Sequence, residues 1–216
     1  MKAAIFDMDG LIIDSEPLWR LAERETFARV GLGLTDDECR RTTGLRSDEV
    51  VGYWYERQPW RGATCSEVHR DLDSRVTALI QERGRTMPGV RDLIELLRGA
   101  GLRLALASSS SRELIDVVLN TLKLNGLFEV VSSGVEEEKG KPDPAVYLTT
   151  VRRLGLAAEE CCALEDSAAG VQAARAAGCR VVAVPSPEDF DDPRFDLAHH
   201  KLHSLTDFDL GLLCPP

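Results

Sequence analysis

Clusters of lysine and arginine are missing from this sequence of 216 residues, whose formal net charge is -10. Proteins that bind nucleic acid use such clusters to displace counterions from phosphates, so we expect no nucleic-acid partner. Internal repeats and low-complexity segments are missing too. With 44% hydrophobic residues, the chain can bury the core of one domain, or of one domain that carries a large insertion.

Long apolar runs are also missing. The first run, Ala3 to Phe6, follows a single basic residue and is interrupted by Asp7 after only four positions. Such a run is too short for the apolar segment of a secretory signal or for a membrane span. We therefore expect a cytoplasmic protein that has no membrane partner.

Paired cysteine motifs are the third absence. The six cysteines form no CxxC pair and show no zinc-ligand spacing. We expect them to be reduced and mostly buried in the core, as free cysteines usually are. They are Cys39, Cys65, Cys161, Cys162, Cys179 and Cys214.

From about residue 88 onward, segments with helical periodicity alternate with short apolar segments, which is typical of a parallel sheet covered by helices. The helix signals include the capping-box pattern from Ser110 to Glu113, the pair Asp143–Pro144, and Ser167 as an N-cap. We predict strands over residues 3–6, 102–107, 161–164 and 180–184. The expected fold class is α/β, a Rossmann-like parallel sheet with helices on both faces.

The N-terminal part departs from this alternation, because helical periodicity follows the first strand at once. We predict helices over residues 17–30, 48–55 and 66–83. We interpret residues 15–85 as an all-α cap inserted after the first strand, and residues 1–14 and 86–216 as the α/β catalytic core. Hinges are expected near residues 13–16 and 84–88. The alternative that these helices simply pack on the sheet stays open at this point.

The segment Asp7-Met8-Asp9-Gly10 stands where the first apolar strand ends. On an extended chain, residues two apart point to the same side, so the carboxylates of Asp7 and Asp9 can face one site. Gly10 allows the backbone to turn sharply beside them. Alone this pattern is a weak signal, because a solvated turn after a strand would look the same.

Three further polar features fall near the ends of predicted strands. Ser108 and Glu165–Asp166 each follow a strand, and Lys141 lies in the loop before a core helix. Each has an ordinary alternative: a strand-end hydroxyl, an N-cap at Asp166, and a surface lysine. Open α/β sheets bind ligands at the carboxyl ends of their strands, so the combination favours one shared site.

The chemistry of these groups suits phosphoryl transfer. Four acidic groups close together raise one another's pKa, and the cluster therefore needs a cation to stay ionised. A hard site of oxygen ligands with room for water suits Mg²⁺ better than zinc. A lysine and a hydroxyl beside the metal can neutralise a phosphoryl group while it transfers.

At these residues the chain resembles the haloacid dehalogenase superfamily, specifically its phosphatases with a helical cap. The resemblance covers essentially the whole chain and rests on DMDG at Asp7, the strand-end Ser108, GKPDP around Lys141, and ED at Glu165–Asp166. Wider stretches, including AAIFDMDGLIIDSEPLW and ALEDS, resemble the bacterial hexitol phosphatases, also described as 2-deoxyglucose-6-phosphate phosphatases. This closer likeness favours a sugar or sugar-alcohol phosphate as the substrate.

The resemblance implies a role for each residue. Asp7 would attack phosphorus to form an aspartyl phosphate, and Asp9 would act first as general acid and then as general base. The residues implied to bind the phosphoryl oxygens are Ser108, Ser109 and Lys141. The ligands implied for Mg²⁺ are the Asp7 carboxylate, the Asp9 backbone carbonyl and Asp166, with Glu165 behind them. The cap residues implied to select the substrate are Glu16, Trp19 and Arg46.

Two rival functions were weighed against a phosphatase. A β-phosphoglucomutase-type mutase has a histidine where this chain has Trp19 and a lysine where it has Ser111, so both positions disfavour it. A non-catalytic regulator that binds a phosphorylated ligand is disfavoured because a binding module has no need of two aspartates that face an anion. We expect a monomeric phosphatase whose partner is a small phosphorylated molecule.

Overall fold

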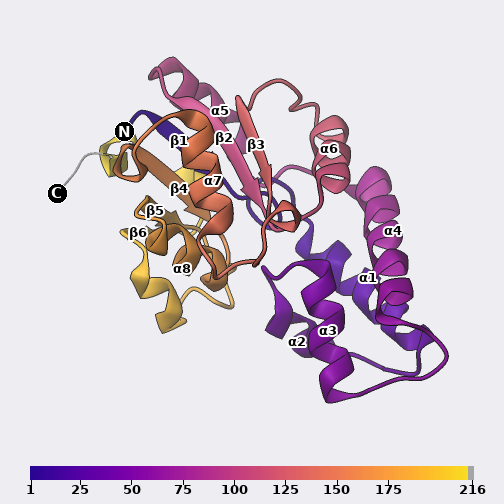
Figure 1. The fold of residues 1–216 in the computed structure, drawn as a ribbon. Coiled ribbons are helices and arrows are strands. Elements are labelled where there is room, and N and C mark those ends of the chain that lie inside the picture. Colours follow the sequence, from indigo (N-terminus) through magenta and orange to yellow (C-terminus); the bar gives the residue numbers. More distant parts are fainter. Residues whose placement is uncertain (214–216) are drawn as a thin grey trace.

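The computed structural model describes residues 1–213, which form one parallel sheet and the helices around it (Figure 1). The strand order is β3-β2-β1-β4-β5-β6, and every neighbouring pair is parallel. The strands are Ala3–Phe6 (β1), Arg103–Ser108 (β2), Val130–Ser133 (β3), Cys161–Glu165 (β4), Arg180–Ala183 (β5) and His200–Lys201 (β6). The strand order reverses beside β1, and open α/β sheets bind their ligands at such a point.

Helices cover both faces of this sheet. They are Val90–Gly99 (α5), Arg112–Thr121 (α6), Ala145–Leu154 (α7) and Ala168–Ala176 (α8). Side chains alternate along β1, so that Ala4 and Phe6 pack with α5 and α6, whereas Ala3 and Ile5 pack with α7 and α8. Because both faces are buried, β1 is apolar throughout. The predicted α/β fold class is confirmed.

Two local predictions differ from the structure. The capping box over Ser110 to Glu113 is wrong, because Ser111 is the N-cap of α6 and its hydroxyl accepts from the backbone N–H of Leu114 at 3.3 Å. The strands β3 and β6 were not predicted. β3 contains two serines among its four residues and β6 has only two residues, so neither gives a clear apolar signal.

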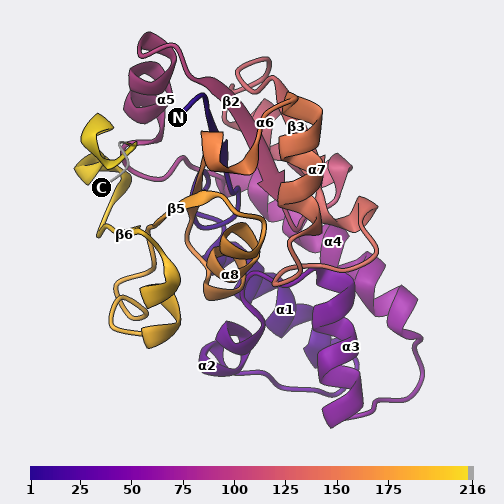
Figure 2. The same ribbon diagram turned by 60° about the vertical axis from the view of Figure 1, so that its left-hand side comes forward.

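The chain between β1 and α5 folds into helices that lie to one side of the sheet (Figures 1 and 2). They are Glu16–Arg29 (α1), Asp36–Cys39 (α2), Ser47–Arg57 (α3) and Cys65–Arg83 (α4). α4 contacts α1 and α3 within this group and α6 outside it, and its apolar side chains continue the core on that face of the sheet. None of the helices in the described part of the chain is long and apolar enough to cross a membrane.

Two chain segments join these helices to the sheet, and they lie side by side. Ile13 pairs with Thr86 in a short antiparallel bridge. The backbone N–H of Asp14 donates to the carbonyl of Arg85 at 2.9 Å, and the N–H of Met87 donates to the carbonyl of Ile12 at 3.0 Å. The segments expected to act as hinges are therefore hydrogen-bonded to each other.

The cysteines of the described residues are free. Cys39, Cys161, Cys162 and Cys179 are buried, and Cys65 is half-buried. Burial raises the pKa of the Cys162 thiol to about 12, so this side chain behaves as an inert core residue. Cys214 lies outside the described residues.

Candidate active site

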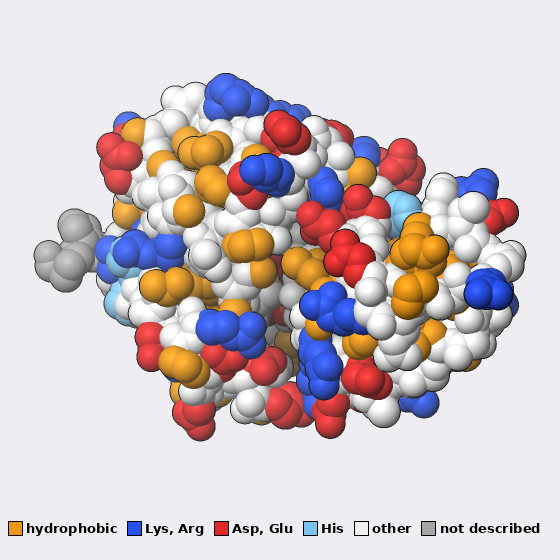
Figure 3. All heavy atoms as spheres, turned by 60° about the horizontal axis from the view of Figure 1, so that its bottom comes forward, with side chains coloured by type: hydrophobic (Ala, Val, Ile, Leu, Met, Phe, Trp, Pro, Cys, Tyr) orange, Lys and Arg blue, Asp and Glu red, His pale blue; other side chains and the backbone are white. Residues whose placement is uncertain are grey.

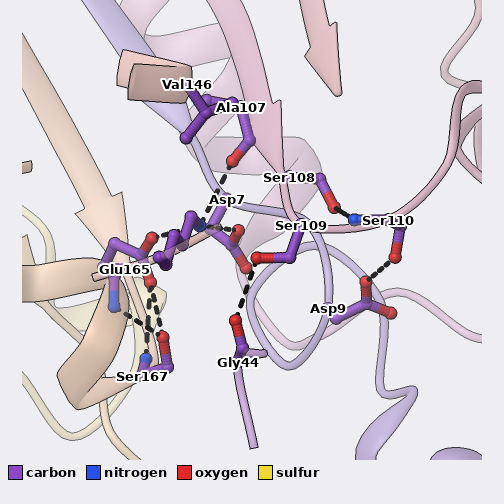
Figure 4. A network of polar contacts seen from close by, with 12 residues as sticks. Asp7, Asp9, Gly44, Ala107, Ser108, Ser109, Ser110, Val146, Glu165 and Ser167 are labelled. Atoms are coloured by element: carbon purple, nitrogen blue, oxygen red, sulfur yellow. Dashed lines mark hydrogen bonds and ion pairs between the residues drawn. The ribbon is translucent and has the colours of Figure 1, made fainter. Parts of the chain in front are cut away.

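Asp7 directly follows the central strand β1. Its backbone N–H donates to the carbonyl of Leu164 at 3.0 Å, and Phe6 pairs in register with the same residue of β4. The carboxyl ends of β1, β2 and β4 therefore meet at one edge. Figure 4 shows Asp7, Ser108 and Glu165 there, so the predicted convergence at this edge is present.

Lys141 is the cation of this edge. It is only 3% exposed, so it is not a surface lysine. Its Nζ lies 2.5 Å from Oδ1 of Asp7 and 2.5 Å from Oε1 of Glu165. Burial alone would lower the pKa of Lys141, but the two carboxylates outweigh burial and raise the pKa overall. The ammonium group is therefore charged and shared between two acids.

The acids at this edge form a cluster that fits a divalent cation. Asp7, Glu165 and Asp166 each place a carboxylate oxygen within 4.8 Å of the others. Burial and mutual repulsion raise the pKa of both Asp7 and Asp166, although the nearby Lys141 opposes the rise. A bound cation would relieve this repulsion, because its positive charge would offset the negative charges of the carboxylates.

The three acids are not equally available to a cation. Glu165 accepts hydrogen bonds from Lys141, from the hydroxyl of Tyr147 and from Ser167, whose Oγ lies 3.2 Å from Oε2. Asp166 accepts none from the described residues, because Ser167 and not Asp166 caps α8. Asp166 is thus the freer ligand, and Glu165 supports the lysine behind it.

Gly10 is required beside Asp166 for two reasons. Its φ is +76°, in the left-handed region that favours glycine. A Cβ at this position would also lie 1.9 Å from Oδ2 of Asp166, closer than any side chain can stand. The glycine of the DMDG segment therefore makes room for a carboxylate.

Asp9 accepts hydrogen bonds from three side chains. Ser15 Oγ lies 2.7 Å and Trp19 Nε1 lies 2.9 Å from Oδ1, and Ser110 Oγ lies 2.8 Å from Oδ2. Ser15 and Trp19 stand at the start of α1, whereas Ser110 belongs to the loop after β2 (Figure 4). The carboxylate is therefore oriented by both parts of the molecule, and the structure places Trp19 against Asp9.

The serines after β2 face the same site. Ser108 is buried, and its Oγ accepts from the backbone N–H of Ser110 at 3.1 Å. Ser109 donates to the carbonyl of Gly44 at 2.9 Å, which is a contact between the sheet edge and the helical part. Both serines line the cavity beside Asp7.

The remaining predicted residues have different positions. Glu16 lines the cavity, and burial together with the charge of Asp9 raises its pKa to about 7. Arg46 instead donates to the carbonyls of Glu137 at 3.1 Å and Gly134 at 3.4 Å. It therefore ties the loop before α3 to the loop after β3, and it is not among the residues that line the cavity.

The cavity lies between the sheet edge and α1. Its volume is about 50 Å³, which holds only one or two water molecules. Two larger hollows of about 380 and 500 Å³ adjoin Asp166 on the outer side. Figure 3 shows the surface hollowed along this seam, with acidic and basic side chains on its margins.

Sequence reasoning missed several residues of the site, among them Ser15, Ser110, Arg20 and Glu23. Ser110 was assigned to a helix cap. Arg20 and Glu23 line the cavity from α1. With Glu16 they recur at intervals of three or four residues, so a polar stripe on one helix face was the available signal.

Comparisons with known proteins agree with this geometry. The family model of haloacid dehalogenase-like hydrolases matches residues 4–184. Hexitol phosphatase B of Escherichia coli O157:H7 is 44% identical over 206 residues, which cover 95% of this chain and 93% of that protein.

Solved structures agree as well. CbbY from Rhodobacter sphaeroides in complex with phosphate has a TM-score of 0.87 and 30% identity, covering 99% of both chains. β-Phosphoglucomutase from Clostridium difficile has a TM-score of 0.85 over 98% of this chain and 94% of its own, but its 21% identity shows the fold alone. The chain therefore belongs to the family of haloacid dehalogenase-like hydrolases and is an enzyme of that family, as its phosphatase relative is.

Proposed function

We propose that the protein is a Mg²⁺-dependent phosphatase that hydrolyses a small sugar or sugar-alcohol phosphate through an aspartyl-phosphate intermediate. The observation that carries the proposal is the setting of Asp7. Its carboxylate is buried at the end of the central strand, held by Lys141 at 2.5 Å and two residues from the oriented acid Asp9. The 44% identity to a hexitol phosphatase supports the choice of substrate class.

In the first step, a carboxylate oxygen of Asp7 attacks phosphorus, and the bond between phosphorus and the alcohol oxygen breaks. Lys141 holds Oδ1 of Asp7, so Oδ2 is the oxygen proposed to attack. Protonated Asp9 gives its proton to the departing alcohol oxygen. During transfer, the ammonium group of Lys141 offsets the negative charge of the phosphoryl oxygens, and the hydroxyl of Ser108 binds them.

In the second step, Asp9 is a carboxylate and takes a proton from a water molecule. The water oxygen attacks phosphorus, inorganic phosphate leaves, and Asp7 regains its carboxylate. The hydrogen bonds from Ser15, Trp19 and Ser110 hold the carboxyl group of Asp9 in one orientation for this step. One acid thus serves both steps.

Asp7 and Asp166 are the side chains proposed to hold Mg²⁺, together with the backbone carbonyl of Asp9. Carboxylate and carbonyl oxygens are the ligands that Mg²⁺ prefers. When bound, the ion would reduce the repulsion between the carboxylates and the phosphoryl group. The hydrogen bonds already made by Glu165 support its place behind these ligands.

We further propose that residues 15–85 act as a cap on the core formed by residues 1–14 and 86–216. The paired segments around Ile13 and Thr86 support hinge positions near residues 13–16 and 84–88. The cavity of about 50 Å³ is smaller than the few hundred cubic ångströms that ligand pockets usually have. Substrate would therefore enter when the two parts separate, and closure would exclude water.

Phosphate release from a panel of esters tests this function. Purified protein is incubated with hexitol, hexose and glycerol phosphates and with p-nitrophenyl phosphate, with Mg²⁺ or with excess EDTA. We expect release with Mg²⁺ and none with EDTA. No release from any ester would contradict the phosphatase, and release in EDTA would contradict the metal. Conversion of β-glucose 1-phosphate in the presence of its bisphosphate, without phosphate release, would favour the mutase instead.

A further inference from the structure

One face of α1 turns toward the catalytic cavity. Glu16, Trp19, Arg20 and Glu23 share this face, and all of them line the cavity. Trp19 donates to Asp9 at 2.9 Å, so the face begins at the acid proposed to protonate the leaving group. Because a helix rises 1.5 Å per residue, Glu23 lies about 6 Å farther along α1 than Trp19.

Glu23 is an unusual residue on this face because it is buried and incompletely paired. Its exposure is 6%, and its Oε2 has no hydrogen-bond partner in the described part of the chain. A buried polar atom without a partner destabilises a fold, so its presence in a cavity wall points to a ligand that supplies the partner.

The chemistry of Glu23 suits a hydroxyl group. Burial raises its pKa to about 8, a contact of the carboxyl group with the Cys39 thiol lowers it in part, and the charge of Glu16 adds to the rise while Arg20 opposes it. At neutral pH the carboxyl group therefore carries a proton and can both donate and accept a hydrogen bond. A substrate hydroxyl has the same two capacities, so the two groups can pair fully.

The charges of the helical wall disfavour a second anionic group at this end of the cavity. The acids Glu16 and Asp73 line it beside Glu23, whereas Arg20 and Lys141 are the cations among the described lining residues. Lys141 is engaged by two carboxylates of the sheet edge, and Arg20 lies 3.5 Å from Glu16. A neutral group is therefore favoured next to Glu23.

We infer that Glu23 is a substrate-binding residue that hydrogen-bonds a hydroxyl at the far end of the leaving group. Glu23 lies about 6 Å along α1 from Trp19, the donor to Asp9, and this offset suits a leaving group that extends several carbons beyond the ester oxygen. This inference rests on the proposed phosphatase function. It adds that the enzyme selects substrates whose leaving group is neutral, carries several hydroxyls and is long enough to reach α1.

The substitution Glu23→Leu tests the inference, with released phosphate as the measurement. For a hexitol 6-phosphate, kcat/KM should fall roughly 10- to 100-fold, because a substrate hydroxyl loses its hydrogen-bond partner on α1. For glycerol 3-phosphate and p-nitrophenyl phosphate it should stay within about twofold, because neither leaving group carries a hydroxyl that reaches Glu23. Glu23→Gln, which keeps a donor and an acceptor, should retain most of the activity on hexitol phosphate.

A matched control is Glu25→Gln, two residues away on the outer side of α1. Glu25 is exposed and pairs with Arg75, so its substitution should alter turnover of no substrate. Thermal unfolding of each variant reports the fold. The wild-type protein gives a second measurement that needs no variant, because kcat/KM should rise from glycerol 3-phosphate to a hexitol 6-phosphate.

The outcomes separate this inference from the function on which it rests. Equal losses of Glu23→Leu on all three substrates, or no loss on hexitol phosphate, would overturn the inference. Equal kcat/KM values of the wild type for three-carbon and six-carbon phosphates would overturn it as well. Absence of phosphate release by the wild type from every ester would instead overturn the proposed phosphatase.

Discussion

Two groups of buried or half-buried acids face each other across one cavity, and they are held in different ways. At the sheet edge, Asp7 and Glu165 share the ammonium group of Lys141 at 2.5 Å. On α1, Glu16 and Glu23 have Arg20 as their nearby cation, and their pKa values rise to about 7 and 8. Burial raises the pKa in both groups, but the first is held against a buried ammonium group, whereas the cation of the second is a partly exposed arginine. The role of an acid in this cavity thus follows from its partners as well as from its burial.

The largest predicted effect is a loss of activity when an acid of the sheet edge is replaced. Asp7→Asn removes the proposed nucleophile with almost no change of shape, so kcat should fall by at least about 10⁴-fold. Released phosphate measures the loss, and circular dichroism should show an unchanged fold. Activity near that of the wild type would show that Asp7 is not the nucleophile.

Lys141→Met tests whether the lysine is what allows the sheet-edge acids to be buried. Without it, two buried carboxylates face each other, and the free energy of unfolding should fall by about 3–5 kcal/mol. Urea unfolding at pH 7 without metal measures the change. The double variant Lys141→Met/Glu165→Gln should regain part of the loss, because one of the two charges is gone. A change below about 1 kcal/mol in the single variant would contradict this account.

Trp19→Phe probes the hydrogen bond by which α1 reaches Asp9, the acid between the two groups. It removes one donor to Asp9, so kcat should fall about 10-fold while KM changes less. Trp60→Phe is the matched control, because the indole N–H of Trp60 is buried in the described structure without a partner. Equal effects of the two variants on kcat would show that the hydrogen bond to Asp9 is unimportant.

The last prediction concerns the pH dependence of stability on the α1 side. The pKa of Glu23 rises from 4.5 to about 8 on folding, so the folded state holds a proton that the unfolded state releases. Its contribution to stability is therefore lost as pH rises from about 4.5 to 8, by up to about 1.4 kcal/mol per pH unit. Glu23→Gln should flatten this part of a plot of unfolding free energy against pH, measured with Mg²⁺ present. An unchanged slope would contradict the raised pKa.

The sequence predicts the fold class because periodicity is a local property. The helices α1 and α4 and the strands β1, β2, β4 and β5 agree with the predicted ranges within two residues. β3 was missed because two of its four residues are serines, which carry no apolar signal of their own. Its place at the sheet edge beside β2 is decided by tertiary pairing.

The residues of the site also fall into two classes, those that local patterns predict and those that tertiary packing places. Asp7, Ser108 and Glu165 could be predicted to meet, because the ends of parallel strands lie together. Ser110, Trp19 and Glu23 could not be placed in the same manner. Their positions depend on how α1 approaches the sheet edge, and no local pattern encodes that approach.

The paired segments at Ile13 and Thr86 have a consequence for timing. If residues 15–85 act as the proposed cap, these two hydrogen-bonded segments would restrict its movement to rotation about the line through Ile13 and Thr86. Ser15 and Trp19 would travel with α1 during such rocking, whereas Ser110 would stay with the sheet. Asp9 would then accept a hydrogen bond from one side chain in the open enzyme and from three side chains in the closed enzyme. Under the proposed cap movement, Asp9 would thus be fully oriented only in the closed enzyme, and closure would couple substrate binding to proton transfer.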